Sequence, residues 1–170
     1  MLKVLGADTE GSVYLDPDGM FPNHIPNPED KTAMDSISKA VLDSKADLGV
    51  IFDTDVDRGG AVDSFGKEIN RNRLVALASA IALEGTDGGT IVTDSVTSSG
   101  LKDFIENHLG GKHYRYRRGY KNVIDKGIEL NNNGEFCPLA IETSGHAAMK
   151  ENYFLDDGAY LYYYHWIRSE

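Results

Sequence analysis

The chain has 170 residues, and its 27 acidic and 17 basic side chains give a formal net charge of −10. An acidic chain gains nothing from a phosphate backbone, so we expect no nucleic acid partner. The sequence lacks both a run of about 18 apolar residues and the basic and apolar regions of a signal peptide. We therefore expect no membrane contact and a cytoplasmic location. The single cysteine, Cys137, excludes an internal disulfide, and no Cys/His pair has zinc-site spacing.

The first third of the chain is predicted to contain a strand, an irregular segment, a helix and a second strand. Residues 1–5 could form the first strand, and residues 11–30 are irregular because they hold four of the five prolines. Asn27 is a good N-cap and Pro28 fits a first helical turn, which predicts a helix that starts here. The apolar run Leu48–Phe52 is typical of a strand covered on both faces.

The rest of the chain alternates strands and helices, which favours the α/β class. Asn70 is a plausible helix N-cap, so we expect a boundary between two units near residues 64–70. The predicted elements are a helix over 71–84, a strand over 90–93, a helix over 100–109, a strand over 113–117, a helix over 120–130, a strand over 138–142 and a C-terminal helix begun by Asp156.

Three aspartates alternate directly after the strand at 48–52, at positions Asp53, Asp55 and Asp57. Alternate side chains of an extended loop point the same way, so the carboxylates can converge on one hard cation. Arg58 follows at once and could hold an anionic group beside that cation. The alternative interpretation is a solvated acidic loop.

Two further segments carry candidate chemistry. The basic turn at 117–121 could clamp a phosphate at the start of a helix, although an exposed strand end explains it as well. Residues 142–146 offer a carboxylate, two hydroxyls and an imidazole, a set that suits hydrogen bonding to a polyol. A capped turn would have the same composition.

Taken in order, these segments resemble the α-D-phosphohexomutases, which move phosphate between the 1- and 6-positions of hexose phosphates. Residues 17–29 are similar to the signature of the family's second domain, and residues 46–58 to its metal loop. Residues 118–121 resemble a turn of the third domain, and residues 142–146 its sugar-specificity loop. Asp156-Asp157-Gly158 is also family-like.

The resemblance implies an α/β fold with mixed, mostly parallel sheet layers. Residues 1–68 would be the C-terminal part of domain 2, and residues 69–170 would be domain 3. The expected ligands are a hexose phosphate and a hexose 1,6-bisphosphate. The implied site residues are Asp53, Asp55 and Asp57 for Mg²⁺, Arg58 and Lys121 for catalysis near the phosphoryl group or substrate phosphate, and Glu142, Ser144 and His146 for the sugar.

The chain departs from the family pattern within the metal loop. The family usually has glycine where this sequence has Thr54 and Val56. If either position requires a positive φ, a β-branched Val56 would be strained.

Two expected parts of such an enzyme do not occur in the sequence. These are the phosphoserine in a Ser-His-Asn-Pro context and the phosphate-binding loop rich in Arg and Thr. Phosphoryl transfer depends on positioning and on charge neutralisation. We therefore expect an internal piece of a phosphohexomutase, with the missing domains of the same parent chain as partners and no turnover by itself.

Two other functions fit part of the pattern. Asp53 and Asp55 also resemble the motif of haloacid-dehalogenase-type phosphatases, in which the first aspartate is the nucleophile. However, that motif normally opens its domain, and residues 142–146 would have no explanation. A non-catalytic interaction module that binds a divalent metal is the third interpretation.

Overall fold

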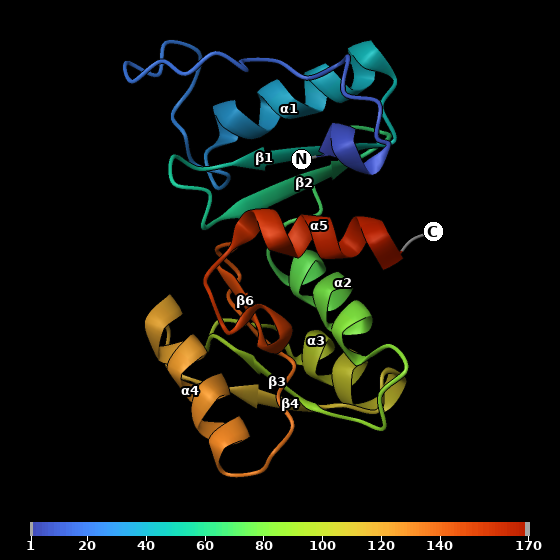
Figure 1. Ribbon diagram of the computed structural model, residues 1–170, viewed down its shortest axis with the longest axis vertical. Coiled ribbons are helices and arrows are strands. Elements are labelled where there is room, and N and C mark those ends of the chain that lie inside the picture. The colour runs from blue at the N-terminus through green and yellow to red at the C-terminus, as the bar shows by residue number, and fades with distance from the viewer. Residues whose placement is uncertain (1, 169–170) are drawn as a thin grey trace.

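The computed structural model describes residues 2–168. The N-terminal unit is a two-stranded antiparallel sheet beneath a helix (Figure 1). Strand β1 (Leu48–Phe52) pairs with β2 (Gly59–Asp63). Helix α1 (Lys31–Ser44) packs on this pair through Met34 and Val41, which form a small core with Val62.

The second unit is built on a four-stranded sheet with the strand order β4-β3-β5-β6. Its strands are β3 (Thr90–Thr93), β4 (Lys112–Arg115), β5 (Leu139–Ile141) and β6 (Ala147–Met149). Strand β3 is parallel to both β4 and β5, whereas β6 is antiparallel to β5. The sheet is therefore mixed and mostly parallel, as expected.

Helices cover both faces of this sheet, and alternate strand residues belong to different cores. Its helices are α2 (Asn72–Leu83), α3 (Ser99–Asp103) with a π-helical continuation (Phe104–His108), and α4 (Tyr120–Asn132). Ile91 packs in the core that includes α2 and α3, whereas Val92 packs with α4. This alternation follows from the two-residue period of a strand.

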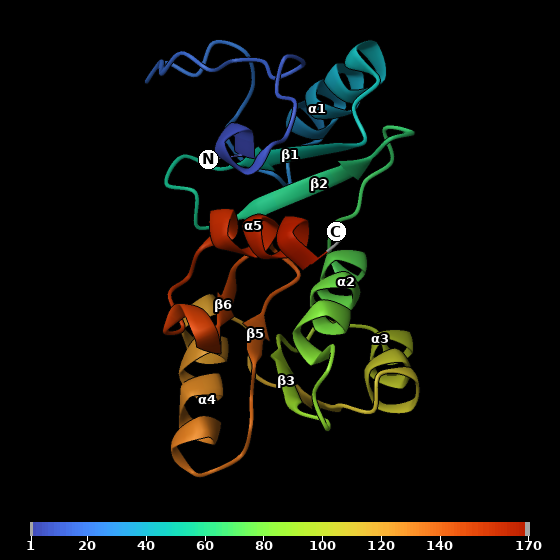
Figure 2. The ribbon, with the colours of Figure 1, turned by 45° about the vertical axis from the view of Figure 1, so that its right-hand side comes forward.

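Helix α5 (Gly158–Arg168) lies between the two sheets (Figures 1 and 2). Leu161 and Tyr162 are buried in the same core as Ala61 of β2 and Leu74 of α2. The rings of Tyr162 and Phe52 meet edge to face with centroids 6.0 Å apart. Helix α1 covers one face of the β1–β2 pair, and α5 covers the other. Because residues of α5, β2 and α2 share one apolar core, α5 joins the two units.

None of the helices within residues 2–168 combines the length and the apolar character that a bilayer crossing requires.

Several local predictions are wrong, and hydrogen bonds give the reasons. Helix α1 starts after Asp30, whose carboxylate accepts from the amides of Thr32 at 2.9 Å and Ala33 at 3.2 Å. Asn27 instead accepts from the amide of Glu29, so the residues around Pro28 form a turn before the helix.

The other differences concern Asn70 and three short segments. Asn70 does not cap α2, because its side-chain oxygen accepts from the amide of Ala61 at 3.1 Å. Residues Leu2–Leu5 form a 3₁₀ turn rather than a strand, and Met1 lies outside the described residues. Strands β2 and β6 were not predicted, because Gly59–Asp63 and Ala147–Met149 are short and rich in small residues.

Candidate functional site

The loop between β1 and β2 is closed by Asp53 and Arg58. The amide of Asp53 donates to the carbonyl of Arg58 at 3.3 Å. The Arg58 amide donates to Asp53 Oδ1 at 3.2 Å, and Arg58 Nε donates to Oδ2 at 2.6 Å. Burial works to raise the pKa of Asp53, but these bonds hold it below its ordinary value.

The loop brings its three carboxylates together. One oxygen from each of Asp53, Asp55 and Asp57 lies within 4.8 Å of the others. Burial, followed by the neighbouring Asp53 carboxyl, raises the pKa of Asp57 to about 6. Asp57 Oδ1 is buried and has no hydrogen-bond partner among the described residues. This oxygen-only donor set fits a hard divalent cation such as Mg²⁺, which would supply the missing contact.

Two backbone hydrogen bonds with the second unit support this loop. The amide of Gly158 donates to the carbonyl of Val56 at 3.0 Å, and the amide of Gly59 donates to that of Gly145 at 3.5 Å. Val56 has a φ of +66°, so the positive φ that would strain a β-branched residue is present at this position. The loop therefore has a fixed backbone in which one β-branched residue is left-handed.

The segment from Glu142 to His146 is a tight turn between β5 and β6. The Glu142 amide donates to the carbonyl of His146 at 2.9 Å. Glu142 is buried, and its carboxylate accepts from the amide of Gly119 at 2.7 Å and from the Ser144 hydroxyl at 3.2 Å. The contact with Gly119 joins this turn to the basic turn at the start of α4.

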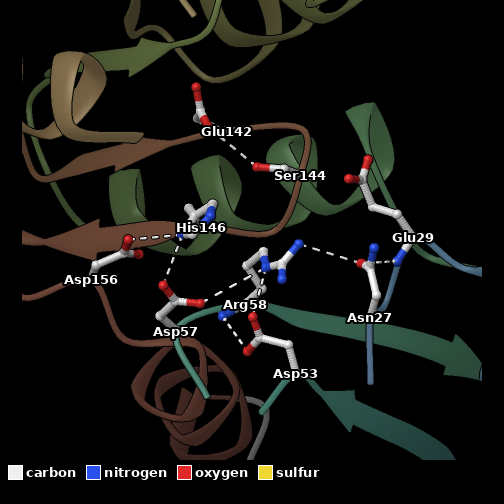
Figure 3. A network of polar contacts seen from close by, with 9 residues as sticks. All are labelled: Asn27, Glu29, Asp53, Asp57, Arg58, Glu142, Ser144, His146 and Asp156. Atoms are coloured by element: carbon white, nitrogen blue, oxygen red, sulfur yellow. Dashed lines mark hydrogen bonds and ion pairs between the residues drawn. The ribbon is translucent and has the colours of Figure 1, made fainter. Parts of the chain in front are cut away.

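His146 connects the turn between β5 and β6 with the acidic loop between β1 and β2 (Figure 3). Its Nδ1 lies 2.8 Å from Asp156 Oδ2 and 3.5 Å from Asp57 Oδ2. The ring stacks on Tyr120 with centroids 4.7 Å apart and an interplanar angle of 19°. Burial works to lower the pKa of His146, but the bond to Asp156 and the two carboxylates raise it.

The remaining predicted residues lie differently. Lys121 is exposed and pairs with Asp125 one helical turn later at 2.9 Å, so it does not join the network. The guanidinium of Arg58 also reaches Asn27 Oδ1 at 3.4 Å. Ser144 lines a pocket of about 230 Å³ together with Lys31 and Arg71.

Sequence reasoning did not identify three members of the network as site residues, namely Asn27, Tyr120 and Asp156. Asn27 had been interpreted as a helix cap. All three lie within segments that resembled the family, and Tyr120 adjoins Lys121 in the sequence. A family-like segment was thus the available signal, but the contacts of Tyr120 and Asp156 with His146 could be seen only in three dimensions.

Comparisons with known proteins agree with this arrangement. Residues 1–66 match the profile of phosphoglucomutase/phosphomannomutase α/β/α domain II, and residues 70–164 match that of domain III. A phosphomannomutase/phosphoglucomutase of Pseudomonas syringae pv. tomato is 34% identical over 94% of this chain and 33% of its own length. A phosphoglucomutase of Neisseria meningitidis is 30% identical over 94% of the chain and 34% of its own length.

A crystal structure of a phosphoglucomutase/phosphomannomutase family protein from Burkholderia thailandensis superposes with a TM-score of 0.75 at 31% identity. The match covers 86% of this chain and 31% of that one. The chain thus spans about a third of the length of the relatives it matches. Because the two domain profiles together cover most of its residues, the chain belongs to the phosphoglucomutase/phosphomannomutase family.

Proposed function

We propose that the chain is the metal-binding and sugar-binding part of a Mg²⁺-dependent phosphohexomutase. The enzyme would transfer phosphate between the 1- and 6-positions of a hexose phosphate through a hexose 1,6-bisphosphate. Residues 1–68 would contribute the metal loop and residues 69–170 the sugar loop. The observation that carries this proposal is the buried Asp57 Oδ1, which lies 3.9 Å from Arg58 Nε but accepts no hydrogen bond from the described residues, beside two other carboxylates.

Asp53, Asp55 and Asp57 would hold the cation. Once bound, it would neutralise charge on the phosphoryl group that is transferred. Arg58 holds Asp53 in place through both carboxylate oxygens, which keeps the loop in one conformation. Its fixed guanidinium would bind phosphate oxygens from the same side of the site.

Glu142 and Ser144 would bind the sugar hydroxyls. A hydroxyl both donates and accepts, so a buried carboxylate and a side-chain hydroxyl can satisfy it together. These two groups are 3.2 Å apart and bonded to each other. A sugar hydroxyl would replace this bond, and the contact between Glu142 and the Gly119 amide would keep the carboxylate in place meanwhile.

Lys121 would bind the phosphate of the substrate. Its present partner is Asp125, and the side chains of the pair are 77% and 57% exposed. Exposed pairs of this kind contribute only about 0–1 kcal/mol. Exchanging Asp125 for a doubly charged phosphate would therefore cost Lys121 little.

Metal binding tests the proposal directly. Titration of Mn²⁺, followed by water proton relaxation, should show that Asp55→Ala weakens binding by at least about tenfold, since it removes an oxygen ligand. Asp55 is exposed, so its loss should leave the fold intact. Asp47→Ala is the matched control, because Asp47 is exposed and lies outside the loop. Equal affinity in the wild type and Asp55→Ala would refute the metal assignment.

Turnover is the second test. The sequence contains no Ser-His-Asn-Pro stretch that could exchange a phosphoryl group. We expect the purified chain to show no mutase activity on glucose 1-phosphate in a coupled assay with added hexose 1,6-bisphosphate. The phosphoserine and the second phosphate clamp would come from other domains of a longer protein. Robust activity of the pure chain would show that this division of labour is wrong.

The phosphatase alternative makes a different demand on Asp53, which would have to attack phosphorus. Both oxygens of Asp53 are engaged by Arg58, and the side chain is only 2% exposed. We therefore expect beryllofluoride with Mg²⁺ to leave Asp53 unmodified and p-nitrophenyl phosphate to remain unhydrolysed. An adduct on Asp53, detected by fluorine NMR, would favour the phosphatase.

A further inference from the structure

The imidazole of His146 is held on several sides. Asp156 contacts Nδ1 at 2.8 Å, and the ring of Tyr120 stacks on one face with centroids 4.7 Å apart. The backbone of His146 forms a bridge to Arg58 and accepts from the amide of Glu142. In Figure 3 the opposite edge of the ring, which carries Nε2, faces away from Asp57 and Asp156.

The distances decide which carboxylate accepts a hydrogen bond from Nδ1–H. An ionised carboxylate can only accept, so a neutral imidazole bonded to one through Nδ1 must carry its proton there. Asp156 Oδ2 is at hydrogen-bonding distance, 2.8 Å, whereas Asp57 Oδ2 is 3.5 Å away. The Nδ1–H group therefore donates to Asp156, and Asp57 stays available to a cation.

Asp156 is itself held by the backbone around it. It forms a bridge with Ala148 of β6, and the amide of Asp157 donates to the carbonyl of Ala147 at 3.0 Å. The Asp156 side chain is only 15% exposed. Because β6 directly follows His146 and is bridged to Asp156, the backbone holds both members of the pair.

We propose that Asp156 is a positioning residue that fixes the ring of His146, so that Nε2 faces the bound sugar phosphate while Nδ1 is kept from Asp57. This rests on the proposed function, in which His146 belongs to the sugar site. In the neutral ring Nε2 accepts a hydrogen bond from a sugar hydroxyl. Without Asp156, the Nδ1–H tautomer would lose its acceptor at 2.8 Å, and the ring would no longer be fixed.

The tautomer of His146 provides a test that needs no ligand. Long-range proton–nitrogen NMR at alkaline pH, where the ring is neutral, distinguishes Nδ1–H from Nε2–H, and His146→Gln assigns the signal. We expect Nδ1–H in the wild type and a shift toward Nε2–H in Asp156→Ala. Asp157→Ala is the matched control, since it removes the neighbouring carboxylate, which caps α5 at Tyr160 instead. It should keep the wild-type tautomer.

Ligand binding is the second readout. With glucose 1-phosphate and Mg²⁺, followed by chemical shift changes, we expect Asp156→Ala to bind about 3- to 10-fold more weakly than wild type, as for the loss of one hydrogen bond. Asp157→Ala should bind as the wild type does. A shifted tautomer with weaker binding supports the proposal.

Three results overturn it. One is an Nε2–H tautomer in the wild type, which can be measured even if Asp156→Ala does not fold. Another is an unchanged tautomer in Asp156→Ala, and the third is a shifted tautomer with unchanged affinity. If the wild type does not bind glucose 1-phosphate at all, the proposed function of the site fails, and the ligand-facing role of Nε2 fails with it. The tautomer would still decide whether Asp156 fixes the ring.

Discussion

Replacing Val56 by glycine should stabilise the protein. Val56 has a φ of +66° in the loop between β1 and β2, and a non-glycine residue held in such a region costs about 1–3 kcal/mol. Glycine removes this cost but loses about 0.5–1 kcal/mol through the larger entropy of the unfolded chain. Val56 is 36% exposed and belongs to none of the apolar cores among the described residues, so little packing is lost. The net gain in free energy of unfolding is about 1 kcal/mol.

Thr54 provides the matched control, because it is the other position at which the family usually has glycine. Its φ is not positive, so Thr54→Gly has no strain to relieve and should lower the free energy of unfolding by about 0.5–1 kcal/mol. Calorimetry and urea unfolding, both without metal, measure the two changes. For a chain of this size we expect Val56→Gly to raise Tm by about 2–4 °C. If Val56→Gly lowers Tm as Thr54→Gly does, the loop is not strained at Val56.

Three further predictions concern the second unit. Burial lowers the pKa of His113 to about 4 in the folded chain. Between about pH 6.5 and 4 the unfolded chain therefore takes up a proton that the folded chain does not. The free energy of unfolding falls as the pH falls through this range. About 3 kcal/mol is lost across this window, and urea unfolding at several pH values should show that His113→Gln removes this dependence. Gly145→Ala should cost about 2–3 kcal/mol by calorimetry, because Gly145 has a φ of +102° and a Cβ would lie 2.6 Å from the carbonyl oxygen of Gly59. Burial raises the pKa of the Cys137 thiol to about 12, so iodoacetamide should alkylate it about a thousandfold more slowly in the native protein than in urea.

Each of these has an outcome that contradicts it. Retention of the full pH dependence in His113→Gln would assign it to other groups. Gly19 has no neighbouring atoms that a Cβ would meet, so Gly19→Ala is the control for Gly145→Ala, and equal Tm values in the two would disprove close packing at Gly145. Rapid alkylation of native Cys137 would show that the core around it opens readily.

Features set by neighbouring residues could be predicted from the sequence. The strand at 90–93 was predicted with its observed bounds, because its four residues are apolar or β-branched. Asp53, Asp55 and Asp57 converge as predicted, since alternation within one short loop suffices to bring them together.

Features that depend on distant partners were not predictable in this way. Arg58 and Asn27 are separated by 31 positions and meet only because β1 and α1 pack together. His146 and Asp156 become neighbours through the path of β6 and its following turn. Two good capping residues, Asn27 and Asp30, lie three positions apart, and propensity alone could not choose between them. The partner of Lys121 in the structure, Asp125 one helical turn later, was likewise not predicted.

The support that the second unit gives to the loop between β1 and β2 has a consequence for recombining relatives of this family. The carbonyl of Val56 depends on the amide of Gly158, and a Cβ at position 158 would lie 2.9 Å from the carbonyl carbon of Arg58. A chimera that joins residues 1–66 of one relative to the following unit of another would therefore have a native loop sequence. The residues of the second unit that contact this loop would come from a different protein. Divergence between relatives should be coupled across this boundary, so that glycine at 145 and 158 is exchanged together with the loop and not independently of it.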